Sequence, residues 1–434
     1  MALRAALASA EVGRKAGRRR HRLGAFFVDR LSAACPTASR IVGPTSLRIL
    51  GHVRRLLLLV SSIVFVDAML FTALTPLVPG YAEEFGLSKT GAGLLVGAFG
   101  AGALLGGVPG GLAAARFGPK SAVVGGLVVL AVASFAFAAA DGAWTLGAAR
   151  FLQGLSSTTT WAGALAWIVV ASPRNQRGQI LGTAFGAAVF GAVIGPMFGG
   201  VAELVGVRAS FATVGVVSLA FAAVAAGSRP AAPEPASPGG LSRAFRDPRF
   251  LGGLWLNTLP ALLFGMLTVL VPLALAEDDW ATLAIATVFF VAGLIEVVIN
   301  PLLGRATDRH GRLLPVRAAL AASVVVATGL ALASEPVVIA VLVVLAAISF
   351  GGFYTPGMSL TSHRADTAGL AQGLAFGVMN SAWALGNMTG PALGGALASS
   401  FGDAAPYALG AALCAITLVA TQRVAPERAR PHEA

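Results

Sequence analysis

Long apolar stretches, separated by short segments that carry most of the charged residues, recur along most of this 434-residue chain. Each stretch holds about 20 residues or more, the length that an α-helix needs to cross a hydrocarbon core about 30 Å thick. Strands of a membrane β-barrel would be shorter and would alternate apolar and polar positions. The pattern predicts an all-α membrane protein with twelve transmembrane helices at residues 56–79, 90–114, 119–140, 143–171, 179–202, 207–227, 250–275, 280–303, 313–334, 336–358, 368–397 and 404–422.

A stretch rich in proline and alanine at 228–249 divides the spans into two sets of six and is typical of a flexible linker. The two sets repeat each other, at an offset of 193 residues for the loops after the second and eighth spans and of 195 for the fifth and eleventh spans. The matched positions are Gly111 with Gly304, Arg116 with Arg309, Gly118 with Gly311, Gly195 with Gly390 and Pro196 with Pro391. Two pseudo-symmetric six-helix halves of this kind place a substrate site between them, near the bilayer midplane.

The linker and the repeat together predict how the chain is divided. The expected segments are a basic, disordered cytoplasmic tail at 1–52, a first half at 53–227, the cytoplasmic linker at 228–249, a second half at 250–422 and a cytoplasmic tail at 423–434. A second interpretation of the basic tail is that the coding sequence begins further on, because "HVRRLLLLV" is an ordinary start for a membrane protein.

Charge along the chain predicts its orientation. If both ends lie in the cytoplasm, 28 of the 31 lysines and arginines fall on the inner side, as the positive-inside rule requires. The net charge of +12 then reflects topology and a tail that contacts anionic lipid, so nucleic-acid binding is not expected. Usage rich in arginine and alanine but poor in lysine favours a bacterial genome, and hence a multi-pass protein of the bacterial plasma membrane.

Composition and spacing argue against an enzyme. Hydrophobic residues make up 56% of the chain and charged residues only 12%, with a mean hydropathy of +0.80. The histidines fall in tails or inner loops, no histidine–cysteine cluster has the spacing of metal ligands, and no Walker-type phosphate loop is present. We therefore expect no metal, no cofactor and no enzymatic activity.

Several motifs then connect the chain to a known family. The loop after the eighth span reads G-x-x-x-D-R-x-G-R through Gly304, Asp308, Arg309, Gly311 and Arg312, and the loop after the second span keeps Gly111, Arg116 and Gly118 but has Ala115 in place of the acid. The fourth span carries Arg150, Gln153 and Gly154, and the fifth carries Gly191, Gly195, Pro196, Gly199 and Gly200, with Gly390 and Pro391 as counterparts in the eleventh. These residues resemble the motifs of the major facilitator superfamily, and within it the twelve-span drug:proton antiporters.

The resemblance covers about 55–425 and implies alternating access of a site between two halves. The glycine–proline series of the fifth span also implies export. In physical terms, spaced glycines let helix backbones approach closely and a proline bends its helix. We expect the series to act as a hinge or to pack closely against the opposite half, with static packing as the alternative.

One acid lies deep within an apolar span. Asp67 is eleven residues past Leu56, about 16 Å along a helix, which places it near the bilayer centre. A charge there costs at least about 2.5 kcal/mol, so the residue is a candidate for proton exchange or cation binding. Its position in the repeat corresponds to Pro260, so the architecture does not demand an acid. The alternative is a static pair with Arg150 or a cap on a kink near Pro76.

Other side chains could complete a site around this acid. Glu296 is a possible second proton site or a partner of the basic inner loop, and Phe71 offers an aromatic wall one turn from Asp67. Arg150 begins a stripe at helical spacing that includes Gln153 and Trp161. The remaining candidates lie in the eleventh span, and they are Asn380 and Trp383. These residues either line a small-molecule cavity or join neighbouring helices.

The sequence thus predicts a secondary transporter, a monomer in the lipid bilayer, that exports a small organic compound in exchange for protons, with a cation as one candidate. Asp67 would bind the substrate or the proton, and the charge of Arg150 would modulate it. A proton-coupled uptake symporter is the alternative within transport, and a non-transporting receptor on the same fold is the alternative outside it.

Overall fold

The computed structural model describes residues 44–172, 176–230, 240–310, 313–370 and 372–422. Within these ranges, side chains are described except at 44–52, 177–178, 300–301, 303–310, 355, 372–373 and 376. The chain divides into two compact units, Met1–Leu56 and Leu57–Ala434. The second unit holds the helical bundle and all the side-chain contacts described below. Of the sequence expectations, Gly311, Arg312 and most of the basic tail lie outside the described residues.

Every regular element in the described ranges is a helix. The elements of the first half are α2 (Pro44–Ala73), η1 (Thr75–Leu77), α3 (Val78–Glu84), α4 (Lys89–Phe117), α5 (Pro119–Ala138), α6 (Ala143–Ala171), α7 (Arg177–Val205) and α8 (Val207–Gly227). Those of the second half are α9 (Leu241–Arg246), α10 (Pro248–Glu277), α11 (Thr282–His310), α12 (Leu313–Leu332), α13 (Pro336–Gly351), α14 (Tyr354–Thr367), α15 (Gln372–Phe401) and α16 (Ala404–Gln422).

Ten spans among the described residues are long and apolar enough to cross a membrane. The two expected spans that fall short are α6 and α15, although each has the length to cross with 29 and 30 residues. Both carry hydroxyl, amide and indole groups along one face, which lowers their mean hydropathy. With these two helices the bundle has the twelve spans that the sequence predicts, and the two most polar helices carry most of the candidate site residues.

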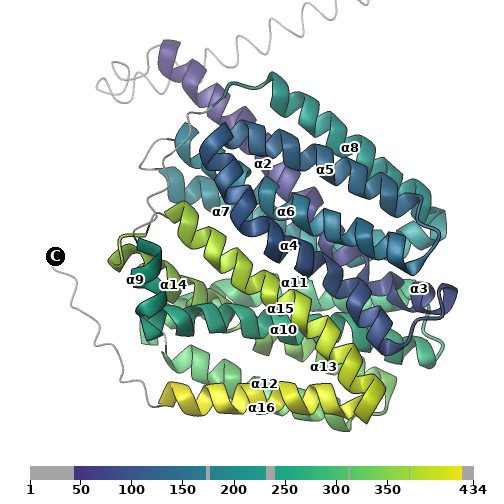
Figure 1. Cartoon of the computed structure of the whole chain (residues 1–434). Coiled ribbons are helices and arrows are strands. Elements are labelled where there is room, and N and C mark those ends of the chain that lie inside the picture. The colour runs from purple at the N-terminus through teal and green to yellow at the C-terminus, as the bar shows by residue number, and fades with distance from the viewer. Residues whose placement is uncertain (1–43, 173–175, 231–239, 311–312, 371, 423–434) are drawn as a thin grey trace, which may run out of the picture. The chain divides into compact units, whose positions relative to one another are not determined.

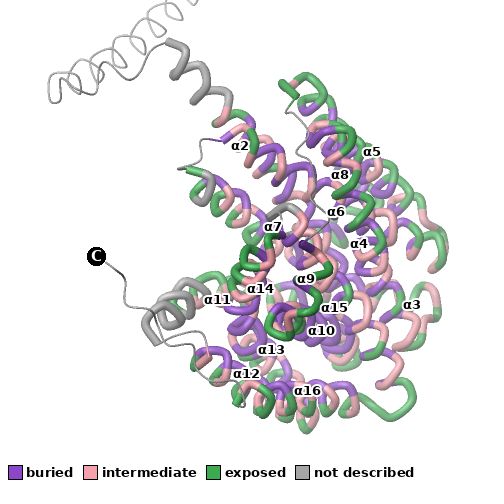
Figure 2. Tube along the Cα trace, turned by 60° about the vertical axis from the view of Figure 1, so that its left-hand side comes forward, coloured by how far each residue is buried: buried purple, intermediate pink, exposed green. Residues whose placement is uncertain are grey.

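The two halves pair through helices that the repeat relates. α4 packs along α15, and α7 packs along α11. Because α11 is the counterpart of α4 and α15 is the counterpart of α7, the two contacts are related by the same pseudo-symmetry. Figure 1 shows α5 beside α8 and α12 beside α16, and both pairs are in contact. These helices lie away from the pairing surfaces, and Figure 2 shows exposed residues along α8 and α16.

The glycine–proline series has the same role in both halves. Three glycines of α7 lie against the backbone or side chains of α2, and their counterparts in α15 lie against α10. The pairs are Gly191 with Gly386, Gly195 with Gly390, and Gly199 with Gly394. Only the fourth glycine of each series, Gly200 or Gly395, turns to the opposite half, where it meets α11 or α4. Close packing against the opposite half is thus found at one glycine of each series, while the other three pack within their own half. A hinge at the series stays a prediction.

Two spans are broken where the site forms. The first span leaves α-helical geometry after Ala73, passes through η1 and continues as α3, because Pro76 and Pro79 have no N–H for helix hydrogen bonds. The tenth span stops at Gly351 and resumes at Tyr354. The first break frees backbone carbonyls beside α6, and the second places Tyr354 at the start of a new helix.

Candidate functional site

Asp67 is buried in α2, with only 3% of its surface exposed. Its Oδ2 accepts a hydrogen bond of 2.7 Å from Ser157 Oγ and one of 2.8 Å from Trp161 Nε1. Ser157 and Trp161 lie four residues apart and so share one face of α6. The other carboxyl oxygen, Oδ1, is buried without a hydrogen-bond partner among the described residues. An unpaired buried charge is unfavourable, so binding of a proton or a cation at this oxygen would stabilise the site.

Arg150 is also buried, but its hydrogen bonds do not go to the acid. Its Nη1 donates to Gln153 Oε1 at 3.0 Å and to Leu70 O at 3.3 Å, and its Nη2 donates to Phe71 O at 3.2 Å. The guanidinium also lies 4.9 Å from the centre of the Phe99 ring. Instead of the alternative static pair with Asp67, Arg150 forms a cap on the carbonyls near the end of α2.

The reason for this difference is helix register. α2 and α6 run side by side in opposite directions, so the residues of α6 that follow Arg150 by two turns are level with Asp67. Arg150 itself is level with Leu70 and Phe71, close to the break before η1. It stabilises the broken end of α2.

Phe71 and Trp383 form a contact between the halves. The Phe71 ring lies 4.9 Å from the ring of Phe99 and 5.1 Å from that of Trp383. These aromatic residues, with Ala103 and Ala384, belong to one apolar cluster. Of the two alternatives for Phe71 and Trp383, a cavity wall or a contact between helices, the geometry favours the second, because both rings are engaged in this interhelical packing.

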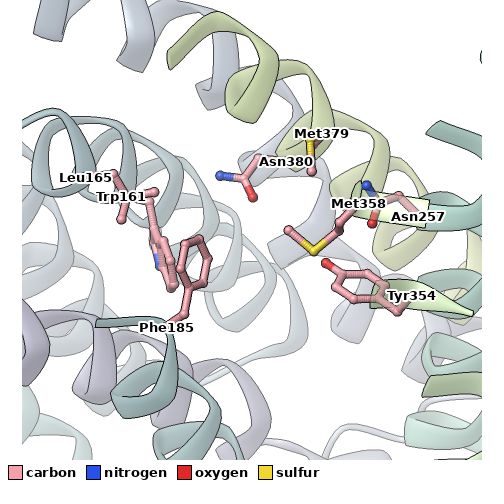
Figure 3. Close-up of a pocket in the computed structure, with 8 residues that line it drawn as sticks. All are labelled: Trp161, Leu165, Phe185, Asn257, Tyr354, Met358, Met379 and Asn380. Atoms are coloured by element: carbon pink, nitrogen blue, oxygen red, sulfur yellow. The ribbon is translucent and has the colours of Figure 1, made fainter. Parts of the chain in front are cut away.

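A small pocket, with a cavity volume of about 20 Å³ in this conformation, lies between the two halves, close to Trp161. It is lined by Trp161 and Leu165 of α6, Phe185 of α7, Asn257 of α10, Tyr354 and Met358 of α14, and Met379 and Asn380 of α15. Figure 3 shows the Trp161 and Phe185 side chains on one side, the Tyr354, Met358 and Asn257 side chains on the other, and Asn380 directed into the space between them. Trp161 and Asn380, both expected to line a cavity, do so.

The lining follows the internal repeat. Six of the eight residues are repeat-related pairs, at an offset of 193 for α6 with α14 and of 195 for α7 with α15. The pairs are Trp161 with Tyr354, Leu165 with Met358, and Phe185 with Asn380. A pocket lined by such pairs lies on the axis that relates the halves, which is where a transporter of two repeats has its substrate site.

Trp161 belongs both to the pocket and to the surroundings of the acid. Its indole N–H bonds Asp67, while its ring lines the pocket and lies 5.6 Å from the ring of Phe185. Asp67 itself is not among the lining residues, so the acid is screened from the pocket by this indole. Trp167, one helical face away, is 1% exposed and does not line the pocket.

The lining carries no formal charge. Its polar groups are the indole N–H, the Tyr354 hydroxyl and the two side-chain amides, and the rest are apolar or thioether groups. Asn257 is 1% exposed, and neither its Oδ1 nor its Nδ2 has a hydrogen-bond partner among the described residues. Aromatic walls with a few polar anchors are typical of sites for small organic molecules.

Glu296 does not line this pocket, but it interacts electrostatically with Tyr354, which does. It is half-buried in α11, and its carboxyl group lies against α13 at Gly351, where an added Cβ would stand 2.8 Å from Oε1. A role as a second proton site remains a prediction.

The loop motif residues are placed in part. Gly118 joins α4 to α5 with φ at 89°, a conformation that favours glycine, and Arg116 lies over the neighbouring Phe117 ring at 5.5 Å. No atom lies within 4 Å of where a Cβ on Gly111 would stand. In the second half Gly304, Asp308 and Arg309 fall in α11, and their side chains lie outside the described residues.

Sequence reasoning missed part of the lining. Phe185, Met358 and Met379 carry no motif and no charge, so nothing in the sequence alone marks them. The repeat offset was a usable signal, because it maps Trp161 onto Tyr354 and Asn380 onto Phe185. No group of three or more potential metal ligands occurs among the described residues.

Comparisons with known proteins connect these features to a family. Residues 60–375 match the sequence model described as the Major Facilitator Superfamily. Multidrug resistance protein 2 of Bacillus subtilis (strain 168) is 24% identical over 359 residues, which cover 79% of this chain and 89% of that protein. Quinolone resistance protein NorA of Staphylococcus aureus (strain MRSA252) is 28% identical over 144 residues, which cover 33% of this chain and 37% of NorA.

Solved structures share the fold. A bacterial homologue of the human lysosomal transporter Spinster, in an inward-facing and unoccupied conformation, superposes with a TM-score of 0.70 at 16% identity, covering 85% of this chain and 95% of that one. A D-xylose–proton symporter superposes with a TM-score of 0.65 at 15% identity, covering 85% and 98%. At these identities the likeness extends to the fold alone.

Proposed function

Because the chain belongs to the major facilitator superfamily of secondary transporters, we propose that it exports small organic compounds, cations among them, in exchange for protons. The family membership predicted from the loop and helix motifs is confirmed, as are the twelve-helix fold and the assignment to transporters rather than enzymes. The substrate and the coupling ion belong to the proposal.

The observation that carries the proposal is the double role of Trp161. Its indole bonds the buried carboxyl group of Asp67 and also lines the pocket on the pseudo-symmetry axis. Asp67 is thus one side chain away from the pocket that the substrate would occupy. A buried acid in a membrane span is a candidate proton site. The two sites share one residue, which is the arrangement that coupling requires.

The same indole gives a route for coupling. Hydrogen bonds to the ionised form of an acid favour that form. A compound in the pocket that holds Trp161 in its observed position therefore promotes loss of the proton from Asp67. When the compound leaves and the ring is free to move, Asp67 can take up a proton again. Binding of substrate then releases a proton, as in antiport.

Export is supported by the similarity to Multidrug resistance protein 2, which extends over most of both chains. The glycine–proline series gives less support than expected. Its glycines make equivalent contacts in α7 and in α15, so they serve the fold of both halves rather than marking one direction of transport.

The proposed orientation follows the charge pattern, with both termini in the cytoplasm and the start of α4 on the outer side. At that outer end Lys89 forms ion pairs with Asp403 at 2.7 Å and with Glu277 at 3.3 Å, and so joins the first half to the second. Thr90 Oγ1 lies 3.0 Å from Ser399 Oγ beside them. These contacts support a conformation in which the outer side is closed.

The test uses everted membrane vesicles with an acid interior, to which cationic, neutral and anionic aromatic compounds are added in turn. Export of a compound into such vesicles releases protons, which a pH-sensitive dye detects. Release with cations, absent in vesicles without the protein, would support proton antiport. Proton-driven movement of compounds in the opposite direction would instead identify an uptake symporter and contradict the proposal. Binding without any transport would identify a receptor.

A further inference from the structure

Asn257 is held in place by its neighbours on α10. Leu256 packs against Gly357 of α14, and Thr258 Oγ1 donates a 3.0 Å hydrogen bond to Ala382 O of α15. With the residues on either side fixed against two different helices, the side chain between them has little freedom. Figure 3 shows its amide directed toward the pocket, near Met358 and Tyr354.

The amide group is buried without a protein partner. Asn257 is 1% exposed, and both Oδ1 and Nδ2 lack a hydrogen-bond partner among the described residues. Leaving buried polar groups unpaired costs about 1–3 kcal/mol each. The thioether of Met358 is at best a weak acceptor and does not replace a partner.

The fold does not require an amide at this position. The repeat places Val64 at the equivalent position in the first half, where the side chain is fully buried. A valine or leucine in α10 would therefore fit the architecture of the bundle without an unpaired polar group. The carboxamide at Asn257 is a departure from the repeat, and it faces the pocket.

The unpaired atoms define what they recognise. A carboxamide presents one acceptor and two donors in a plane, so a ligand with an adjacent N–H and C=O can bond both Oδ1 and Nδ2 in a cyclic pair. Primary amides, lactams and imides have this arrangement, whereas esters lack the N–H. Because the pocket lining carries no formal charge, this part of the ligand is neutral.

We propose that Asn257 selects transported compounds that carry a primary amide, lactam or imide group, by forming two hydrogen bonds with that group in the pocket. This inference rests on the proposed use of the pocket as the substrate site, but not on proton coupling. In this proposal Asp67, on the far side of Trp161, couples transport to protons, and the amide of Asn257 selects the compound.

The test compares two probes that differ only at the recognised group, 4-[2-(diethylamino)ethoxy]benzamide and the corresponding methyl benzoate ester. Binding to the full-length protein in lipid nanodiscs is measured by isothermal titration calorimetry. We expect the amide to bind about ten-fold more tightly than the ester, since one good hydrogen-bonded pair is worth about that factor. In Asn257→Leu the two probes should bind equally.

Two further variants make the result specific. Asn257→Val introduces the residue of the repeat-related position and should also abolish the preference if the leucine variant folds poorly. Asn387→Leu removes another buried amide of the second half, whose Nδ2 bonds Trp383 O outside the pocket, and should keep the preference. Equal binding of the probes to the native protein, a preference that persists in both Asn257 variants, or no binding of either probe would each overturn the proposal.

The same samples separate this proposal from the proposed function. If the amide preference is found but the vesicles show no proton release, proton antiport is wrong and the role of Asn257 stands. If protons are released but both probes bind equally, antiport stands and the role of Asn257 is wrong.

Discussion

The indole nitrogen of Trp161 lies 2.8 Å from Oδ2 of Asp67, while the ring of the same residue lines the pocket between the halves. One side chain thus touches both the acid and the pocket. Coupled transport needs such a link, because tight binding alone does not tie one equilibrium to another.

Replacing Asp67 with asparagine should abolish proton release and leave the protein folded. The side-chain oxygen of asparagine can still accept from Ser157 and Trp161, but it cannot carry the proton. Substrate-induced proton release in vesicles should fall to background, with an unchanged melting temperature. The control is Asp141→Asn, which removes an exposed acid paired with Arg208 and should transport normally. Full proton release in the Asp67 variant would exclude the proposed role.

Replacing Trp161 with phenylalanine should uncouple the two sites. The ring is kept against Phe185, whereas the N–H that bonds Asp67 is lost. A hydrogen bond to a charged group is worth about 1.5–3 kcal/mol, so the coupling between the pocket and Asp67 should weaken strongly. We expect calorimetric binding of substrate to persist while proton release per bound substrate falls. Trp167→Phe alters a buried tryptophan outside the pocket and should keep the native ratio.

The contacts of Lys89 should favour the conformation that is closed at this end. Exposed ion pairs contribute about 0.2–1 kcal/mol each, so removing both with Lys89→Met should shift the population a few-fold toward the open form. A cysteine pair at Thr90 and Ser399 reports on this, in a background with Cys35 and Cys414 changed to serine. The rate of disulfide formation should fall in the Lys89 variant and stay unchanged with Arg208→Met. An equal rate in both would contradict a stabilising role.

Adding one methyl group at Gly154 should prevent normal packing of α6. A Cβ at this position would collide with the Phe99 carbonyl oxygen of α4. Overpacking costs about 1–3 kcal/mol, and more where the obstacle is backbone. We expect Gly154→Ala to reduce the yield of folded protein and its melting temperature. Gly186→Ala is the matched control, because nothing lies within 4 Å of its Cβ position, and it should behave as the native protein.

The sequence predicts the helices well because membrane spans are set by length and hydropathy. The predicted limits 143–171, 207–227 and 404–422 agree with α6, α8 and α16. Hydropathy predicts the first and tenth spans as continuous stretches, because it does not register a change of backbone geometry. Only proline and glycine, as near Pro76, indicate that a span bends. The repeat is also visible in the helices themselves, because α11 and α12 start 193 and 194 residues after their counterparts α4 and α5.

The partners of individual side chains could not be predicted equally well. Asp67 and Arg150 are both buried and charged, so pairing them was a natural hypothesis. Their contacts depend on how two antiparallel helices are aligned. In the observed alignment Ser157 and Trp161 bond Asp67, whereas Arg150 bonds backbone carbonyls about one turn further along α2. The same holds for Asn257, because an amide in a helix marks a site only when its atoms prove to have no partner.

The polarity of α6 and α15 has a consequence for how the protein is made. These helices fall below the hydropathy of the ten other spans, and α6 also carries Arg150. An arginine opposes entry into the bilayer by up to about 2.5–3.5 kcal/mol, the value at a helix centre, and Arg150 lies in the first third of α6. During synthesis, therefore, α6 must pack against helices that are already inserted, such as α4, whose Phe99 ring lies against the Arg150 guanidinium. Substitutions that made α6 more apolar would ease its insertion and remove the groups that surround Asp67, so biogenesis and transport place opposite demands on the same helix.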